Sequence, residues 1–219
     1  MNLLHIDSSI SGQQSVSRQL TASIVAHLKG TTPNLEITYR DIVATPIPHL
    51  SPALHKRKSQ ALSESKVVDI QATSSQLDSK TRQLEQDFEI VTKALREFLA
   101  ADIVVLGAPM YNFAIPSQLK AWIDCFTEPG QTFRYTEQGV EGLCADKRII
   151  VASSRGGLYT APSPMAELDH QERYLTSLFS FIGVSDITFV RVEGVNQGGE
   201  QRQRSLSAAL AKIATLRVA

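Results

Sequence analysis

Short apolar runs alternate along the chain with longer segments in which apolar residues recur every three or four positions. The run at 3–6 precedes a segment with helical spacing at 16–28, and a helical segment at 84–98 precedes a longer apolar run at 103–109. A short apolar run is typical of a strand buried in a parallel sheet, and the spaced pattern is typical of a helix that covers one face of that sheet. The first half of the chain therefore predicts strand and helix in turn.

The second half of the chain continues this alternation. The pattern predicts, in order, a helix over 115–126, a hairpin over 132–140, a strand over 149–152, a helix over 174–182, a strand over 187–190 and a last helix with its apolar stripe at 206–213. Pro116 then falls in the first turn of its helix, where a missing N–H is tolerated.

Two further segments complete the predicted architecture. Residues 35–41 alternate apolar and polar side chains, as expected of a strand at a sheet edge. Residues 42–80 are rich in proline, serine and charge, and we expect a surface excursion with only weak helical character. Five strands that alternate with five helices favour a parallel sheet with right-handed crossovers. We therefore predict one α/β domain over residues 1–219, a doubly wound five-stranded parallel sheet of order 2-1-3-4-5 with helices on both faces.

The composition is that of an ordinary globular protein, with 42% hydrophobic and 20% charged residues. Lys and Arg together number 22, as do Asp and Glu, and this balance argues against nucleic acid or an anionic membrane as a partner. The start of the chain lacks the basic region of a signal peptide, and no apolar run reaches the roughly 20 residues of a spanning helix. Cys125 and Cys144 lie far apart, so we expect reduced thiols, no metal site and a cytoplasmic location.

A candidate ligand site follows from the predicted topology, because ligands of such sheets bind beyond the carboxyl ends of the strands, near the first and third. The first strand is followed by a serine-rich loop, residues 8–18, with a single glycine. Its hydroxyls, its N–H groups and the start of the next helix suit a phosphate, although serines that merely cap the helix give the same pattern. Neither the dinucleotide nor the nucleoside triphosphate glycine pattern is present, so the loop favours a phosphate monoester.

The loops after the third and fourth strands add two more features. Residues 108–120 are apolar and aromatic and contain two prolines, so they suit a rigid wall against a flat ring, unless they are buried as core or interface. Residues 153–157 end in Gly156 and Gly157, which let backbone N–H groups approach a ligand closely, unless they form an ordinary turn. Together the three loops favour flavin mononucleotide (FMN) better than any one of them does alone.

Four segments of the sequence resemble the FMN-dependent NADH azoreductase family, whose members are flavodoxin-like NADH:quinone oxidoreductases. The resemblance extends from the first strand to about Gly199 and lies in Ser9 with Ser15-Val16-Ser17, Pro109 to Phe113 with Ile115 to Lys120, Thr132 to Glu137, and Ser154 to Gly157. It implies an enzyme that passes two electrons, as hydride, from NADH through FMN to quinones and azo compounds in a ping-pong sequence.

The resemblance also implies roles for individual residues. It assigns the FMN phosphate to Ser9, Ser15, Val16 and Ser17, the isoalloxazine edge to Met110, Tyr111, Asn112 and Phe113, and the pyrimidine end of the ring to Ser154, Arg155, Gly156 and Gly157. No catalytic side chain is required, because the flavin is the reacting centre. Backbone N–H groups of Gly156 and Gly157 would stabilise the negative charge of the reduced ring.

Two expectations concern the surface. We expect a homodimer, because the hairpin at 132–140 and the helix at 115–126 offer aromatic surface beside the flavin site, and the resemblance points the same way. We also expect residues 53–80 to form a mobile, mildly basic flap over the open flavin face that weakly favours NADPH through Lys56, Arg57 and Lys58. A solvated loop without a role in turnover is the alternative for this segment.

Two other functions remain open from the sequence alone. The first is a flavodoxin-like electron carrier that docks on a redox protein, although the zero net charge does not suggest an acidic docking face. The second is an interaction module of the same fold without FMN, because a fold does not fix a function. An absorbance spectrum and an NADH oxidation assay with a quinone as sole acceptor distinguish the three.

Overall fold

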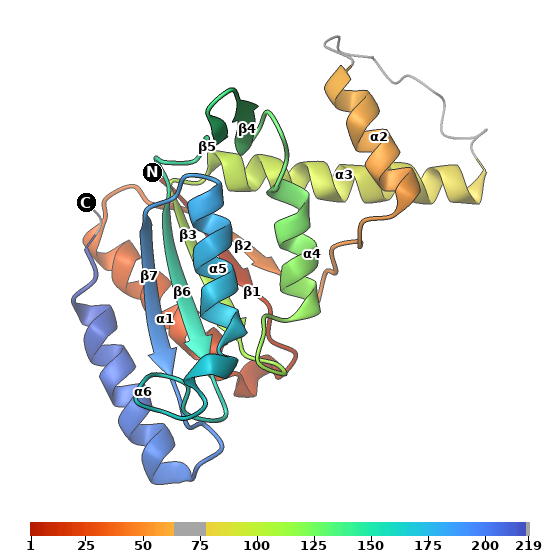
Figure 1. Ribbon diagram of the computed structural model, residues 1–219. Helices are drawn as coiled ribbons and strands as arrows, with labels where there is room; N and C mark the ends of the chain where they lie inside the picture. Colours follow the sequence, from red (N-terminus) through yellow and green to blue (C-terminus); the bar gives the residue numbers. More distant parts are fainter. Residues whose placement is uncertain (64–77, 218–219) are drawn as a thin grey trace.

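The computed structural model describes residues 1–63 and 78–217 and has a five-stranded parallel sheet at its centre (Figure 1). The sheet has the order β2-β1-β3-β6-β7, which is consistent with the predicted order of the five parallel strands. Its strands are β1 (Asn2–Asp7), β2 (Glu36–Asp41), β3 (Ile103–Pro109), β6 (Arg148–Ser154) and β7 (Asp186–Val192). All neighbours in this sheet pair in parallel, so their carboxyl ends meet at one edge.

Helices cover both faces of the sheet, as predicted. One face packs against α1 (Val16–Thr31) and α6 (Gly199–Ala214), and the other against α3 (Ser79–Ala100), α4 (Ser117–Phe126) and α5 (His170–Phe181). The two cores form because successive side chains of a strand point to opposite faces. In β3, for example, Val104 and Leu106 join the α3–α5 core, whereas Ile103 and Val105 join the α1–α6 core.

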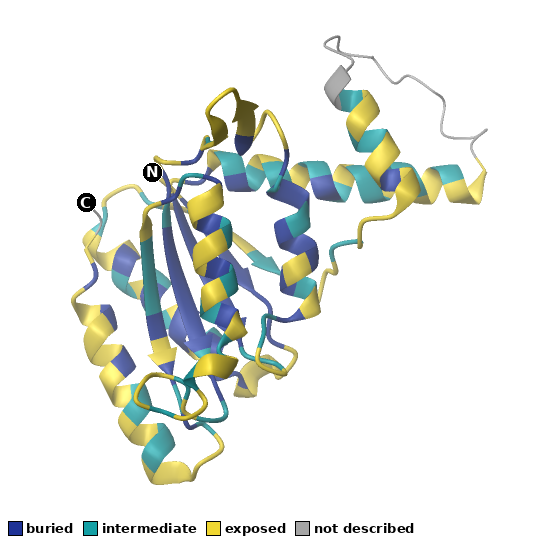
Figure 2. Cartoon of the chain, in the orientation of Figure 1, coloured by how far each residue is buried: buried dark blue, intermediate teal, exposed yellow. Residues whose placement is uncertain are grey.

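Burial along the strands follows their places in the sheet (Figure 2). Every residue of the central strand β3 is buried, whereas β2 has only exposed and half-buried residues. The alternating pattern of residues 35–41 therefore correctly predicted the edge strand. Within the described residues, no helix has both the length and the apolar character needed to span a membrane.

Several predicted boundaries need correction. The helix predicted from Ile115 begins at Ser117, with Pro116 at its N-cap rather than in its first turn, because Pro116 has extended backbone (ψ 147°). The helix predicted from Tyr174 begins at His170, because the Asp169 side chain accepts a hydrogen bond from the Glu172 N–H and caps it. The predicted hairpin is present as β4 (Phe133–Thr136) and β5 (Gly139–Gly142).

The excursion at 42–80 is the largest correction. Residues 52–63 form helix α2 (Pro52–Ser63), which packs against α3 through the fully buried Leu54 and an Arg57–Glu85 ion pair. Lys58 pairs with Glu128 and leaves only 10% of its side chain exposed. The sequence underestimated this helix because its stability comes from packing rather than from intrinsic propensity. Residues 64–77 of the predicted flap lie outside the described residues.

The positions of α2 and the hairpin also differ from expectation (Figure 1). Both lie toward the amino ends of the strands, away from the carboxyl edge where the arrowheads of β6 and β7 point. The part of the predicted flap that is described therefore does not cover the carboxyl edge of its own sheet. The aromatic surface of the hairpin is likewise not beside that edge, and Trp122 and Phe126 of α4 are buried in the core.

Candidate functional site

A cavity of about 280 Å³ lies at the carboxyl edge of the sheet, beside the start of α1. It is lined by eight of the residues that the sequence predicted as ligand contacts, namely Ser9, Ser15, Val16, Met110, Tyr111, Ser154, Arg155 and Gly156. A larger cavity of about 440 Å³ lies between β2 and the end of α3 and is lined by none of the predicted residues. We therefore take the carboxyl-edge cavity as the candidate site, because three predicted loops converge on it.

The serine loop forms the start of α1. The Ser15 hydroxyl accepts a hydrogen bond from the Arg18 N–H (3.3 Å) and so caps the helix, and it lies 3.0 Å from the Ser17 hydroxyl. The first-turn N–H groups of Val16 and Ser17 have no acceptor within their own helix, which leaves them for a ligand. The Ser17 side chain is fully buried and does not line the cavity, so we interpret it as a support for Ser15.

Tyr111 joins two of the three loops. Its hydroxyl accepts a hydrogen bond from the Ile10 N–H (3.1 Å) and lies 3.3 Å from the Ser9 hydroxyl. The Ser9 hydroxyl in turn accepts a hydrogen bond from the Ser11 N–H (3.2 Å). The phenol of the aromatic loop thus fixes the shape of the serine loop.

Asn112 and Phe113 occupy a tight turn immediately after the cavity wall. Tyr111 and Ala114 exchange two backbone hydrogen bonds of 3.0 Å, and the two residues between them have positive φ angles of 47° and 71°. This is the geometry of a primed hairpin turn. Positive φ is costly for a phenylalanine, and such strain clusters at functional sites. The turn leaves the side chains of Asn112 and Phe113 exposed rather than on the cavity wall.

The turn and the cavity wall are tied to the start of α5. The His170 N–H donates to the Phe113 carbonyl (3.1 Å), and the Gln171 side chain bridges the ends of two strands. Its amide donates to the Ala108 carbonyl (2.9 Å), and its carbonyl accepts from the Ser153 hydroxyl (2.7 Å). Buried polar groups that are all satisfied in this way hold a site rigidly.

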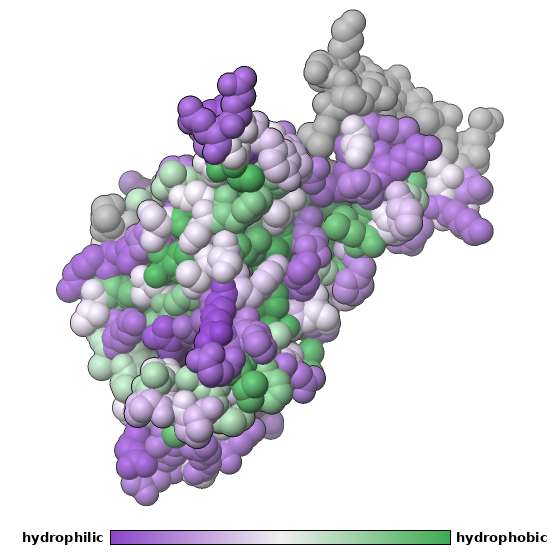
Figure 3. All heavy atoms as spheres, in the orientation of Figure 1, coloured by the Kyte–Doolittle hydropathy of each residue, from purple (hydrophilic) through white to green (hydrophobic). Residues whose placement is uncertain are grey.

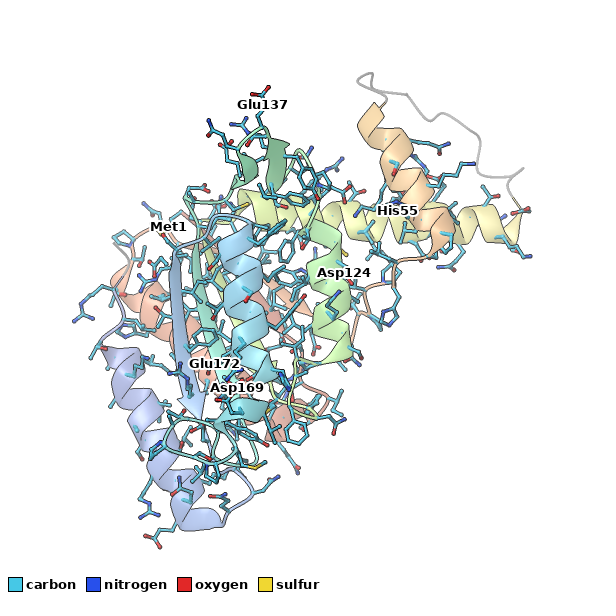
Figure 4. The ribbon with its side chains drawn as sticks, viewed as in Figure 1. Met1, His55, Asp124, Glu137, Asp169 and Glu172 are labelled. Carbon is cyan, nitrogen blue, oxygen red and sulfur yellow. The ribbon has the colours of Figure 1, made fainter. Side chains whose placement is uncertain are left out.

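Arg155 is the centre of a buried ion network. Its guanidinium pairs with Asp169 (2.9 Å), Glu193 (3.0 Å) and Glu172, and only 1% of its side chain is exposed. Figure 4 shows Asp169 and Glu172 at the start of α5, next to the strand ends. The carboxylates offset the cost of burying the cation. The sequence predicted a direct contact between Arg155 and the ligand, but with its guanidinium engaged we interpret Arg155 as a positioning residue.

The loops after β6 and β7 are joined by backbone hydrogen bonds. The Asn196 N–H donates to the Gly156 carbonyl (3.1 Å), and the Gly194 N–H donates to the Gly157 carbonyl (2.9 Å). The Glu193 carboxylate accepts from the N–H groups of residues 159–160. Gly157 is used in this contact and does not line the cavity. Gly156 lines the cavity, and a Cβ there would lie 2.7 Å from the Asn196 side chain.

The serine loop is also held in position by Arg18 and Asp41. Arg18 donates to the Ser9 carbonyl (2.9 Å) and makes two hydrogen bonds to the Asp41 carboxylate (2.6 and 2.9 Å). The hydrogen bond from Arg18 holds the pKa of Asp41 below its usual range. The end of β2, at the sheet edge, thereby sets the position of the loop that follows β1.

Sequence reasoning missed the loop after β7. The additional cavity residues are Ser11, Gln14, Pro109, Val195, Asn196 and Arg202, and the last three follow the fifth strand. The sequence contained a signal for them, because glycines at 194, 198 and 199 stand at the carboxyl end of a predicted strand. The first three lie within loops that the sequence had already identified.

Comparisons with known proteins agree with this geometry. A family model described as a flavodoxin-like fold matches residues 1–216. The chain is 49% identical over 214 residues to an FMN-dependent NADH:quinone oxidoreductase of Rhizobium meliloti (strain 1021), with 98% of this chain and 96% of the relative covered. It is 50% identical over 217 residues to FMN-dependent NADH:quinone oxidoreductase 2 of Xanthomonas euvesicatoria pv. vesicatoria (strain 85-10), with 98% and 92% covered. The crystal structure of an azoreductase from Bacillus anthracis str. Sterne superposes with a TM-score of 0.82 at 27% identity, covering 97% and 96% of the two chains.

Proposed function

The chain belongs to the family of proteins with a flavodoxin-like fold, and from that premise we propose that it is an FMN-dependent NADH:quinone oxidoreductase that also reduces azo compounds. The observation that carries the proposal is the cavity at the carboxyl edge of the sheet, where three sequence-predicted loops meet. The named activities of its relatives support the same substrate classes.

The donors around the cavity fit FMN. The first turn of α1 offers N–H groups and the Ser15 hydroxyl to a phosphate. Met110 and Tyr111 form an apolar and aromatic wall, and Ser154 and Gly156 lie on the wall formed by the neighbouring loop. We propose that these residues, with Ser9 and Val16, bind the cofactor, and that Asn112 and Phe113 border the ring from the adjoining turn.

Bound FMN supplies the two-electron chemistry, and the protein supplies binding, orientation and access. Tyr111 holds the serine loop in place through the Ile10 N–H, and Arg155 with its carboxylates holds the loop that carries Gly156. We propose that the backbone N–H of Gly156, which lines the cavity, donates toward a developing negative charge, as the donors of an oxyanion hole do. Because these groups are fixed before the ligand arrives, little reorganisation is needed during turnover.

We further propose that the enzyme is a cytoplasmic homodimer. Cys125 and Cys144 are free and buried, and burial raises their pKa values to about 12 and about 11, so both are inert thiols compatible with a reducing compartment. A dimer is supported by apolar side chains exposed on the loops around the cavity, Ile10 (62%), Phe113 (39%), Leu158 (38%) and Met165 (38%).

The proposal is tested by a flavin spectrum and a steady-state assay on the same preparation. The purified or reconstituted protein should bind one FMN per chain and oxidise NADH with a quinone as sole acceptor. Initial rates at several fixed quinone concentrations should give parallel double-reciprocal lines, because donor and acceptor react in separate half-reactions. A flavin-loaded protein that does not oxidise NADH would instead be an electron carrier, and a protein that takes up no flavin would be neither.

A further inference from the structure

The candidate site contains a cation that sequence reasoning did not predict. Arg202 lies in the first turn of α6, is half-buried, and lines the same cavity as Ser15 and Val16 of α1. Helices α1 and α6 pack side by side on one face of the sheet. The start of α1 and the first turn of α6 both line this cavity, so Arg202 borders the same space as Ser15 and Val16.

The Arg202 guanidinium has no hydrogen-bond or ion-pair partner among the residues that the structure describes, in contrast to that of Arg204, the nearest arginine on α6. Arg204 pairs with Glu200 (3.4 Å) and donates to the Gln201 side chain (3.1 Å). Glu200, the acidic residue in the first turn of α6, is therefore engaged by Arg204 rather than by Arg202. A half-buried guanidinium without an anion leaves its donors available to an anionic ligand.

The charged residues on the cavity wall also favour an anionic ligand at Arg202. Arg155 and Arg202 are the charged residues among the described residues that line the cavity, and no carboxylate lies among them. Arg155 is paired with three carboxylates, so its guanidinium is engaged within the protein. Of the two arginines that line the cavity, Arg202 is therefore the one whose guanidinium is available to a ligand. In Figure 3 the lower end of the molecule, where α6 starts, is strongly hydrophilic, as expected from the arginines and glutamines at the start of this helix.

We propose that Arg202 binds the phosphate dianion of FMN together with the serine loop, an inference that rests on the proposed function. A phosphate monoester carries a charge of about −1.5 to −2 at pH 7. The serine hydroxyls and the N–H groups of α1 are neutral donors, so they solvate this charge without neutralising it. The planar guanidinium supplies both a positive charge and paired N–H donors that match phosphate oxygens.

The phosphates of NADH or NADPH share this chemistry and are the competing source of the anion. We assign Arg202 to FMN because it shares a cavity with Ser15 and Val16, the residues at the helix start that would hold the FMN phosphate. A residue that served the nucleotide instead would change the KM for NADH or NADPH and leave FMN affinity unaltered. The two assignments therefore predict different measurements.

The test compares Arg202→Ala with the matched control Arg204→Ala, which removes the same charge from the same helix. Apo forms of the full-length protein are titrated with FMN and with riboflavin, which lacks the phosphate, by fluorescence quenching. Arg202→Ala should weaken FMN binding about tenfold and leave riboflavin binding unchanged, because a charge-assisted hydrogen bond at a partly exposed site is lost. Arg204→Ala should alter neither. The FMN affinity of the wild-type protein should also fall more steeply with salt than that of Arg202→Ala.

Three outcomes would overturn the assignment. Equal FMN affinities for the two variants would show that Arg202 has no specific role. Parallel losses of FMN and riboflavin affinity, in Arg202→Ala and in the uncharged polar variant Arg202→Gln, would show a structural role instead. A raised KM for NADH with unchanged FMN affinity would show that Arg202 binds the nicotinamide nucleotide rather than FMN. A wild-type protein that binds no FMN would refute the proposed function itself. The wild-type titration shows this result before any variant is compared.

Discussion

Tyr111 shows how a single hydroxyl can determine the shape of a ligand loop. It accepts the Ile10 N–H and contacts the Ser9 hydroxyl, so the loop after β1 takes its form from a residue about a hundred positions away. The sequence identified both Ser9 and Tyr111 as ligand residues but could not show that they contact each other. Such contacts depend on strand register, which places Asp7 of β1 beside Gly107 of β3.

Replacing Tyr111 by Phe tests this contact. The variant keeps the aromatic wall but removes the acceptor of the Ile10 N–H, and we expect FMN affinity to fall about three- to tenfold, since a typical hydrogen bond contributes about 0.5–1.5 kcal/mol. Tyr135→Phe is the control, because Tyr135 is 73% exposed on the hairpin. Titration of both apo proteins with FMN measures the effect. An affinity of Tyr111→Phe equal to that of the control would show that the hydroxyl does not organise the loop.

The Arg18–Asp41 pair gives a prediction with a defined pH dependence. The hydrogen bond from Arg18 lowers the pKa of Asp41, so the unfolded chain binds the proton more tightly than the folded one. The resulting stabilisation is fully present above the unfolded pKa of about 3.9 and is lost as pH falls through the lower folded value. Asp41→Asn should therefore cost about 1 kcal/mol at pH 7 and progressively less below pH of about 4.

Urea unfolding of Asp41→Asn and the wild-type protein between pH 3 and pH 7 measures this difference. The gap in unfolding free energy should be constant from pH 7 down to about 5 and should narrow toward pH 3. A gap that widens on acidification would mean that the carboxylate destabilises the fold when it is charged.

At the scale of elements, the sequence predicted what depends on periodicity and missed what depends on packing. The strands of the sheet and the helices α1, α3 and α4 were evident because their apolar residues recur with a clear period. Helix α2 was underestimated because few of its residues are apolar, and it is held by Leu54 and by ion pairs with α3 and Glu128. Ion pairs between distant segments leave no local signal in a sequence.

The packing of α2 changes the expectation for nucleotide choice. Lys58 is bound to Glu128 and α2 lies away from the carboxyl edge of the sheet, so the basic residues at 56–58 should not select between NADH and NADPH (Figure 1). Lys58→Ser should leave the ratio of the two kcat/KM values unchanged but lower stability by about 1–3 kcal/mol, because the buried Glu128 loses its partner.

Lys56→Ser is the matched control, since Lys56 is exposed on the same helix and should lose little stability. Thermal melting and steady-state rates with both nucleotides, at low and high salt, separate the two effects. A salt-dependent change in the ratio of the kcat/KM values for NADH and NADPH, in either variant, would show that the basic residues of α2 do influence nucleotide choice.

For the molecule as a whole, the position of the site was more predictable than its full composition. The topological rule for parallel sheets placed the site at the carboxyl edge, and eight predicted residues line the cavity there. The role of Arg155 could not be read from the sequence, because its carboxylate partners come from α5 and from the end of β7. Arg202 was missed for a similar reason, since α6 meets α1 only in the folded chain.

The last prediction concerns assembly. A single chain leaves apolar side chains exposed on three loops around the cavity, and surfaces of this kind mark interaction sites. We expect the flavin-loaded protein to sediment at twice the 24.0 kDa mass of one chain at micromolar concentration. Met165→Glu should shift this protein toward the monomer, because a charge buried in an interface lacks a partner. Tyr135→Glu, on the hairpin at the other end of the sheet, should not. A wild-type mass of 24.0 kDa would exclude the dimer, and dissociation by Tyr135→Glu alone would move the interface to the hairpin.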